Sequence, residues 1–423
     1  MLQLQVIREN KADVLAALSK RQGDFTNIIE DIFSTDENKR TTQVALDNVL
    51  AQSNNISREI GQLMKNGQRD EADHLKTQTL DLKEQEKQLK EQLETLTNQL
   101  NKLMYQVPNL PAAIVPVGLT PEENLNVFEH GDIPKLHEGA LPHWELIKKY
   151  DLIDFELGTK ITAPGFPVYK GKGAKLQRAL ISYFLDKNIE AGYQEFQVPL
   201  MVNEASAYGT GQLPDKEGQM YHDAKDNLYL IPTSEVPVTN IFRDVLLNEK
   251  DLPILCTAYT PCFRREAGSW GAHVRGLNRL HQFDKVEIVR IEKPENSYTA
   301  LDQMVEHIKN ILNELKLPYR ILRLCGGDMG FASALTYDFE VFSTAQDRWL
   351  EISSVSNFET YQANRLKLRF KNTDGKNQLA HTLNGSSLAL PRVLAGLLEN
   401  YQTTEGIVIP EVLRPYTGFD IIK

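Results

Sequence analysis

A regular leucine spacing constrains this chain more than any other feature of its sequence. Seven residues separate successive members of the series Leu75, Leu82, Leu89, Leu96 and Leu103. Leu93 and Leu100 occupy a second position, four residues after members of the first series. Apolar residues at two such heptad positions form a seam along one side of an α-helix, and another helix has to cover that seam. The spacing therefore predicts a long coiled-coil helix that ends near residue 103.

The partner helix is expected directly upstream. Val49, Ile56 and Leu63 form another seven-residue series, and the polar segment 65–70 separates it from the first one. Residues 41–103 contain few Gly, Pro or aromatic residues and many Gln, Glu, Lys and Leu, which is the composition of helices. We expect an antiparallel helical hairpin over residues 41–103. Its legs of roughly 30 residues would each be about 45 Å long.

A projecting hairpin of this kind can either join two copies of a chain or bind RNA as an arm. The heptad pattern is compatible with both. Residues 1–107 carry 14 Lys and Arg against 17 Asp and Glu, so charge does not decide between them. The whole chain has a formal net charge of -10. This charge argues modestly against an RNA partner, because phosphate binding needs at least a local basic surface.

A proline-rich segment follows the hairpin. Pro108, Pro111, Pro116 and Pro121 each lack a backbone donor and discourage a helix from continuing. We therefore expect one domain over residues 1–107 and a second over residues 108–423.

The second domain mixes short β-rich runs with longer amphipathic segments. Strands are expected at 196–198, 228–231 and 286–291, and helices at 173–189 and 297–315. This pattern predicts an α+β fold with a mainly antiparallel sheet flanked by helices.

The low cysteine content and the lack of long apolar runs indicate a cytoplasmic protein. Three cysteines, Cys256, Cys262 and Cys325, are too few for a disulfide framework and indicate a reducing compartment. The first residues lack the apolar core of a secretory signal, and no run of about 18 apolar residues is present. We therefore expect no export and no membrane partner.

Two segments carry the chemistry. Arg264 and Glu266 stand two residues apart in a predicted strand, so both would face one ligand, and an arginine suits a phosphate oxygen. Taken alone, such a pair is equally well explained as an exposed ion pair. The second segment, 383–392, is expected to be a glycine turn that opens an apolar helix carrying Arg392.

These segments resemble class II aminoacyl-tRNA synthetases. Phe263 to Glu266 is similar to motif 2 of that class (about 260–287), the helix that bears Arg392 to motif 3 (about 382–400), and the helix leading to Pro199 to motif 1 (about 173–199). Within the class, the seryl enzymes are matched by Thr233-Ser234-Glu235, His281-Gln-Phe283, Lys285-Val-Glu287, Glu351-Ile352-Ser353-Ser354 and Leu383-Asn-Gly-Ser386. The helical arm completes the match, so the resemblance covers nearly the whole chain. Arg265 and the segment 268–273 depart from the family's pattern.

The resemblance implies a site for ATP with magnesium. Arg264 would bind the α-phosphate, Glu266 the adenine edge and Phe283 the adenine face, while Arg392 would hold the γ-phosphate. Glu351 and Ser354 would bind Mg²⁺, which takes few protein ligands and completes its shell with phosphate and water. The expected catalytic residues are Arg264, Glu351 and Arg392, and the full set expected to bind ATP adds Arg265, Glu266, Phe283, Ile352, Ser353 and Ser354.

The resemblance also implies a serine pocket. The ammonium group would lie against Glu287 and Thr233 with Glu235 close by, and the hydroxyl near Asn384 and Ser386. The expected serine-binding set is completed by Ser234 and Arg264. Such a pocket would reject alanine, which leaves buried polar groups unpaired, and would exclude threonine by size.

The implied reaction is a ligation in two steps. Serine and ATP give seryl-adenylate and pyrophosphate, and the serine then passes to the 3′ end of tRNA(Ser), and of tRNA(Sec) in organisms that have it. The family further implies a homodimer formed through the catalytic domain. No structural zinc is expected, because Cys256, Cys262, His273 and His281 lack the usual zinc spacing.

Two other functions remain open at this point. A relative on the same fold could load an amino acid onto a carrier protein, and it would be expected to lack the arm. A non-catalytic relative could bind RNA or scaffold partners, and it would be expected to lack Arg264, Glu351 or Arg392.

Overall fold

The structure is a computed structural model that describes residues 1–215, 217–267 and 275–423. The segment 268–273, which departs from the family's pattern, lies outside the described residues. The described chain divides into two compact units. One consists of residues 2–19 and 23–108, and the other of residues 1, 20–22 and 109–423.

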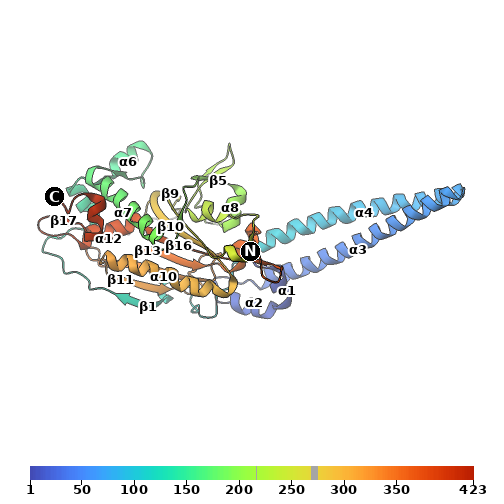
Figure 1. The fold of residues 1–423 in the computed structure, drawn as a ribbon, viewed down its shortest axis with the longest axis horizontal. Helices are drawn as coiled ribbons and strands as arrows, with labels where there is room; N and C mark the ends of the chain where they lie inside the picture. The colour runs from blue at the N-terminus through green and yellow to red at the C-terminus, as the bar shows by residue number, and fades with distance from the viewer. Residues whose placement is uncertain (216, 268–274) are drawn as a thin grey trace. The chain divides into compact units, whose positions relative to one another are not determined.

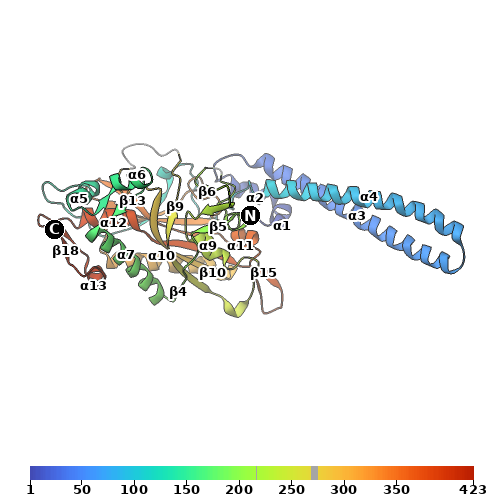
Figure 2. The same cartoon turned by 90° about the horizontal axis from the view of Figure 1, so that it is seen from above.

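The first unit is helical and is dominated by a hairpin. Two short helices, α1 (Leu4–Glu9) and α2 (Lys11–Leu18), precede α3 (Thr26–Lys65) and α4 (Arg69–Met104). The long helices lie side by side along the hairpin in both cartoon views (Figures 1 and 2). At 1.5 Å per residue, α3 is about 60 Å long and α4 about 54 Å. The predicted hairpin is confirmed, but its first leg begins 15 residues earlier than expected, at Thr26 instead of Thr41.

The seam of the hairpin follows the heptad leucines. Leu82 and Leu100 are buried, and Leu75, Leu89, Leu93, Leu96 and Leu103 are half-buried, while most of their neighbours on α4 are exposed. Leu46 and Val49 of α3 are buried as well. The seven-residue spacing therefore identified the covered side of both helices correctly.

The second unit is built on a mixed, mainly antiparallel sheet. Within the described residues this sheet has eight strands in the order β1-β11-β12-β13-β16-β10-β9-β4. All neighbours pair antiparallel except β4 and β9. The strands are β1 (Leu125–His130), β11 (Tyr319–Arg323), β12 (Leu335–Ser343), β13 (Arg348–Asn357), β16 (His381–Ala389), β10 (Gln282–Glu292), β9 (Ile254–Phe263) and β4 (Gln194–Glu195).

Long helices cover one face of the central strands. α10 (Ser297–Glu314) contacts β13 and β16, and α12 (Leu390–Asn400) contacts β10, β12 and β13. A Cβ on Gly385 of β16 would lie 3.5 Å from Met304 of α10, so this face of β16 packs directly on that helix. Because strand residues alternate between faces, the side chains of Asn384 and Ser386 point to the opposite face.

The remaining elements surround this sheet. The other helices are α5 (His143–Lys149), α6 (Phe155–Ile161), α7 (Gly171–Glu190), α8 (Glu204–Thr210), α9 (Glu235–Asn240), α11 (Thr360–Leu366) and α13 (Arg414–Thr417). The described residues also form four small sheets. They pair β7 (Leu228–Leu230) with β5 (Met201–Asn203) and β6 (His222–Asp223), β14 (Arg369–Lys371) with β15 (Asn377–Leu379) and β8 (Leu246–Asn248), β2 (Ile153–Asp154) with β3 (Val168–Tyr169), and β17 (Ile407–Val408) with β18 (Ile421–Ile422).

The predicted α+β class with a mainly antiparallel sheet is confirmed, and three local expectations are wrong. No strand covers 196–198, although the backbone N–H of Phe196 donates to the carbonyl of Thr257. Gly385 lies inside β16 and pairs with Ile288 and Val355 instead of forming a turn. Arg264 and Glu266 follow the end of β9, and Glu266 has a φ of 50°, so strand alternation does not place them.

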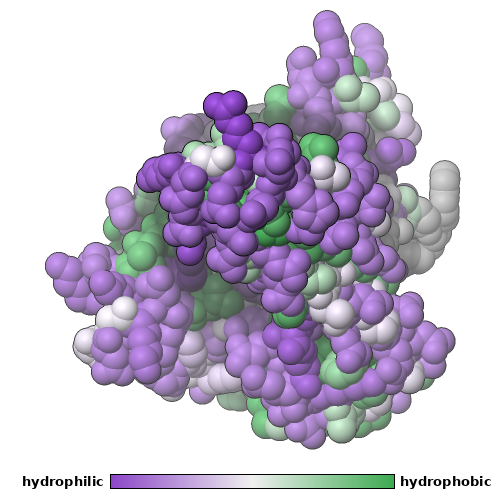
Figure 3. Space-filling view, turned by 90° about the vertical axis from the view of Figure 1, so that its right-hand side faces the viewer, coloured by the Kyte–Doolittle hydropathy of each residue, from purple (hydrophilic) through white to green (hydrophobic). Residues whose placement is uncertain are grey.

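The surface in Figure 3 is mainly hydrophilic. Hydrophobic residues appear on this face only as small, separate patches. No described helix combines the length and the apolar character that crossing a membrane would require.

Candidate active site

A cavity of about 650 Å³ opens on the sheet face that α10 does not cover. Its size is typical of a pocket for a small-molecule substrate or cofactor. The cavity collects side chains from β10, β13 and β16, from the start of α12, and from the segments around 210–220 and 277–280. The residues expected to bind ATP, serine or Mg²⁺ that line it are Thr233, Glu235, Arg264, Glu266, Phe283, Glu287, Glu351, Ile352, Ser353, Ser354, Asn384, Ser386 and Arg392.

One end of the cavity is acidic and deeply buried. The side chain of Glu287 is 1% exposed, and its Oε2 lies 2.5 Å from Nζ of Lys285. The Thr233 hydroxyl donates to the same carboxylate over 3.3 Å. Asn384 and Ser386 reach the cavity from β16, and Ser386 is paired with Glu287 in the sheet. The site thus places a carboxylate beside small polar groups, which suits a ligand with both an ammonium and a hydroxyl group.

A second carboxylate lies close to this end. Oε1 of Glu235 accepts a 2.6 Å hydrogen bond from Gln362, which in turn accepts one from Thr382. Burial, and then the charge of Glu287, raise the pKa of Glu235 to about 7. Glu235 is therefore a carboxyl group that changes its charge near neutral pH.

The cationic groups line another part of the cavity. Arg264 donates through Nε to the carbonyl oxygen of Pro232, and its guanidinium lies 5.3 Å from the centre of the Phe283 ring. Glu266 forms an ion pair with Arg279. This arrangement offers an aromatic face for a base, with an arginine and a carboxylate at its edge.

Arg392 occupies the first turn of α12 and is held by two backbone carbonyls. Its Nε donates to the carbonyl of Asn278 over 3.1 Å, and its Nη1 donates to the carbonyl of Glu351 over 2.8 Å. The same nitrogen lies 3.4 Å from the carboxylate of Glu351. The guanidinium is thus fixed in direction, and its side chain remains 31% exposed to the cavity.

The oxygen ligands near Glu351 fit a magnesium ion that also binds phosphate. Glu351 is half exposed, and Ser354 bonds to the buried Asp338 on the neighbouring strand. Burial and the charge of Glu351 raise the pKa of Asp338, and its Oδ1 has no hydrogen-bond partner within the described part of the chain. In the same part, no group of three His, Cys, Asp or Glu is arranged to hold a metal ion. A cation that takes most of its ligands from phosphate and water fits this donor set.

Two of the predicted site residues do not line the cavity. The Ser234 hydroxyl donates to the carbonyl of Ala258 beneath the pocket. Arg265 is exposed, and its backbone N–H donates to the carbonyl of Gln219. Their binding roles stay predictions.

The sequence interpretation missed six charged side chains among the described lining of the cavity: Asp215, Glu217, Arg279, Lys285, Asp328 and Asp338. Lys285 stands two residues before Glu287 in an apolar strand, and strand alternation would have placed both on one face. Asp338 likewise interrupts the apolar strand β12. Arg279 had no such signal, because its pairing with Glu266 spans 13 residues.

Comparisons with known proteins agree over the whole chain. Residues 1–111 match the model of the seryl-tRNA synthetase N-terminal domain, and residues 219–401 match the tRNA synthetase class II core domain (G, H, P, S and T). A serine–tRNA ligase from Salinibacter ruber is 47% identical over 421 residues, which cover 99% of this chain and 98% of that protein. One from Akkermansia muciniphila is 45% identical and covers 100% and 99%.

Solved structures agree as well. The seryl-tRNA synthetase from Pyrococcus horikoshii, crystallised with ATP, superposes with a TM-score of 0.94 at 30% identity, covering 100% of this chain and 99% of that one. The cytoplasmic serine–tRNA ligase from Naegleria fowleri, crystallised with AMP, gives a TM-score of 0.89 at 25% identity, with the same coverage. From its helical arm to its class II core, the chain belongs to the seryl-tRNA synthetases.

Proposed function

We propose that the chain activates L-serine with ATP to give seryl-adenylate and pyrophosphate, and then transfers the serine to the 3′ end of tRNA(Ser). The observation that carries this proposal is the cavity itself. It combines a buried carboxylate, Glu287, with two directed arginines, Arg264 and Arg392, within about 650 Å³. An amino acid and a nucleotide need these opposite charges side by side.

The acidic end would bind serine. Its ammonium group would lie against Glu287 and Thr233, with Glu235 nearby, and its hydroxyl against Asn384 and Ser386. Lys285 already pairs with Glu287, so the ammonium group would share this carboxylate with a fixed lysine. The pocket is thereby held in shape before serine arrives.

Arg264, Arg392 and Phe283 would bind ATP. Arg264 would contact the α-phosphate and Arg392 the γ-phosphate, while Phe283 would stack on the adenine and Glu266 would accept from its edge. A serine carboxylate oxygen then attacks the α-phosphorus in line, and pyrophosphate leaves with the bonding electrons. Placement and charge neutralisation carry this step. In the second step, the terminal ribose hydroxyl of the tRNA attacks the serine carbonyl carbon, and AMP leaves.

Glu351 and Ser354 would hold Mg²⁺ together with the ATP phosphates. The ion would neutralise phosphate charge during the transfer. The buried carboxyl group of Asp338, bonded to Ser354, adds a further oxygen donor beside these two residues.

The helical hairpin would bind the tRNA, within a domain over residues 1–107, and residues 108–423 would form the catalytic domain. RNA helices are recognised largely by shape and backbone, to which a long narrow hairpin is suited. In organisms with tRNA(Sec), the same arm would bind that tRNA too. The enzyme would work in the cytoplasm, and its three cysteines, all free and buried, support a reducing compartment.

The catalytic domain would form a homodimer. β1 lies at the edge of the eight-stranded sheet, and its apolar residues Leu125, Val127 and Phe128 are 44%, 40% and 37% exposed. An edge strand of this kind is a template for a second chain. Sedimentation equilibrium should give twice the 48.0 kDa mass of the chain, and a single-chain mass would contradict the dimer.

ATP–pyrophosphate exchange tests the proposed function. With Mg²⁺ and no tRNA, we expect serine to stimulate exchange more than any other common amino acid, and at least about 10⁴-fold more than alanine in kcat/KM. Alanine is the critical comparison, because it would leave Asn384 and Ser386 unpaired. Stimulation by a different amino acid would overturn the serine assignment. No exchange with any of them would favour the non-catalytic, RNA-binding alternative.

The pH dependence tests Glu235. The pKa of this carboxyl group is raised to about 7, so it holds a proton below that pH and is charged above it. A charged carboxylate favours the serine ammonium group, so kcat/KM for serine should rise with pH through about 7 and then level off. In Glu235→Gln this rise should disappear. A rise of equal size in both proteins would assign it to another group.

A stability measurement checks the same titration. Between its unfolded pKa near 4.5 and its folded pKa of about 7, Glu235 binds more proton in the folded state. Its contribution to the free energy of unfolding therefore falls as pH rises through this window. In thermal unfolding, the melting temperature of Glu235→Gln should fall less than that of the wild type as pH rises through this window.

A further inference from the structure

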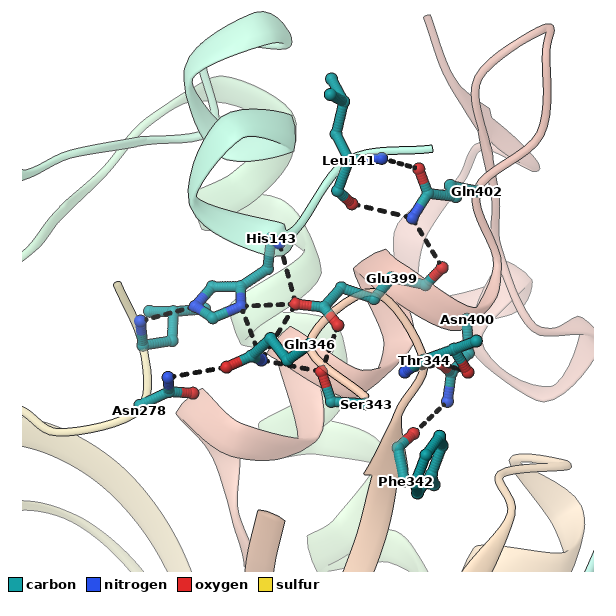
Figure 4. Close-up of polar contacts among 11 residues, drawn as sticks. Leu141, His143, Asn278, Phe342, Ser343, Thr344, Gln346, Glu399, Asn400 and Gln402 are labelled. Carbon is teal, nitrogen blue, oxygen red and sulfur yellow. Dashed lines mark hydrogen bonds and ion pairs between the residues drawn. The ribbon is translucent and has the colours of Figure 1, made fainter. Parts of the chain in front are cut away.

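A polar network that the proposed reaction does not use lies beneath the cavity (Figure 4). Its centre is Glu399 of α12, whose side chain is fully buried, as is that of His143 at the start of α5. The carboxylate of Glu399 accepts from the backbone N–H of His143 over 2.9 Å and from its Nδ1 over 2.7 Å. Ser343 donates to the other oxygen, and Gln346 donates to Oε1 over 3.0 Å. Burial raises the pKa of Glu399, but the hydrogen bonds from His143 and Ser343 and the electrostatic interaction with His143 outweigh burial and lower the pKa.

Two arms of this network reach adjacent residues of the cavity wall. Nε2 of His143 accepts the backbone N–H of Leu277 over 2.9 Å. Oε1 of Gln346 accepts from the side-chain amide of Asn278 over 2.9 Å. Leu277 and Asn278 both line the cavity, and the carbonyl of Asn278 is one of the two that fix Arg392. Figure 4 shows His143, Gln346 and Ser343 converging on Glu399, with Asn278 at the far end of the chain of bonds.

The backbone next to these contacts is shaped to fit them. Gly276 has a φ of 68°, and a Cβ at this position would lie 2.3 Å from Nε2 of His143. Only glycine allows the chain to approach the imidazole so closely. The guanidinium of Arg275 also lies 4.9 Å from the ring of Trp144, the residue after His143. α5 therefore holds three successive residues, 275–277.

Because Leu277 donates to Nε2, the ring proton of His143 resides on Nδ1, where Glu399 accepts it. The two nitrogens thus have separate tasks: Nδ1 anchors the ring to α12, and Nε2 holds the cavity wall. Arg392 lies in the first turn of α12, about two turns before Glu399 in the same helix. The network therefore connects the arginine with the carbonyl that orients it.

We propose that His143 and Gln346, anchored by Glu399, are positioning residues for ATP: they hold segment 276–278 and, through the carbonyl of Asn278, direct Arg392 at the nucleotide phosphates. This inference rests on the proposed function and extends it to residues that touch neither substrate. Its consequence is selective. Loss of the network should impair the use of ATP and leave serine binding unchanged, since the serine end of the cavity is built from other strands.

A matched pair of variants separates positioning from general stability. Asparagine places its amide near Nδ1 of the histidine, so His143→Asn keeps the bond to Glu399 and loses the acceptor for Leu277. Glutamine reaches the position of Nε2, so His143→Gln keeps that acceptor and loses the anchor. In serine-dependent ATP–pyrophosphate exchange by the full chain, we expect kcat/KM for ATP to fall about 10- to 100-fold in His143→Asn and clearly less in His143→Gln. KM for serine should change less than about twofold in both.

Gln346→Ala is the second test, because Gln346 is only half-buried and its loss is compatible with folding. It should show the same selective loss in kcat/KM for ATP. Gln402→Ala is the control. Gln402 bonds to the backbone of Leu141 and to the carbonyl of Glu399, so it joins the same two elements without touching the cavity wall. It should lower the melting temperature and leave kcat/KM for ATP unchanged.

The outcomes are distinguishable. An inactive wild-type protein would overturn the proposed function itself. If the wild type shows serine-dependent exchange, two results would overturn the positioning role alone. One is an equal loss in kcat/KM for ATP in His143→Asn and His143→Gln, and the other is a loss of the same size in Gln402→Ala. Unchanged ATP kinetics in Gln346→Ala would do the same.

Discussion

Replacing Arg392 with alanine should reduce serine-dependent ATP–pyrophosphate exchange about 1,000-fold or more, because the cavity would lose the cation directed at the γ-phosphate. Arg392 is held by the carbonyls of Asn278 and Glu351, so its position is set before ATP binds. Alanine would remove this preorganised stabilisation of the transition state, and a mobile lysine or arginine would not replace it. Binding of serine alone, measured by calorimetry, should be unchanged.

Arg414→Ala is a matched control for this substitution. The Nε of Arg414 donates to a backbone carbonyl, that of Ile409, over 3.1 Å, as Arg392 does with Asn278. Arg414 lies outside the cavity, so its loss should leave exchange unaffected. Exchange at the wild-type rate in Arg392→Ala would exclude the γ-phosphate role. A similar loss in Arg414→Ala would indicate damage to the fold instead.

Shortening the hairpin should abolish tRNA charging and spare amino-acid activation. Residues 45–65 and 69–89 each comprise three heptads, so their joint removal preserves the register of the seam and the turn at 66–68. We expect kcat/KM for tRNA(Ser) in aminoacylation to fall at least about 100-fold, and serine-dependent exchange to stay within about twofold. The reason is that all described residues lining the cavity lie between positions 210 and 392.

Retained charging by the shortened protein would show that the hairpin does not grip the tRNA. The dimerisation role, which the heptad pattern alone left open, would then be tested by the mass of the shortened protein in solution. A single-chain mass would assign the hairpin to subunit contact. An unchanged dimer with lost charging is the result that the proposed arm requires.

The hairpin and the fold class were predictable because their signals are local. The heptad leucines determine which side of α4 is covered, whatever the rest of the chain does. The prolines after Val107 likewise predicted where the helical part ends. The short β-rich runs, mixed with amphipathic segments, predicted an α+β domain after them. The start of α3 was missed, since residues 26–40 contribute helix without the heptad pattern.

The site was predictable to the extent that its residues lie in recognisable motifs. Family resemblance named thirteen cavity-lining side chains, although the strand geometry first invoked for Arg264 and Glu266 was wrong. Long-range partners escaped the sequence. His143 meets Glu399 across 256 residues, and no spacing rule connects two positions so far apart. Only the folded sheet brings them together.

The strand order also has a consequence for synthesis on the ribosome. β16 lies between β10 and β13 in the sheet, but both of these strands precede it in the chain. The helical hairpin can therefore close as soon as residue 104 has emerged, whereas the centre of the sheet stays split until residue 389 is made. During that interval the nascent chain exposes two unpaired strand edges, which are templates for aggregation. Premature termination anywhere before β16 should thus yield a folded hairpin attached to a catalytic domain that chaperones and proteases must clear.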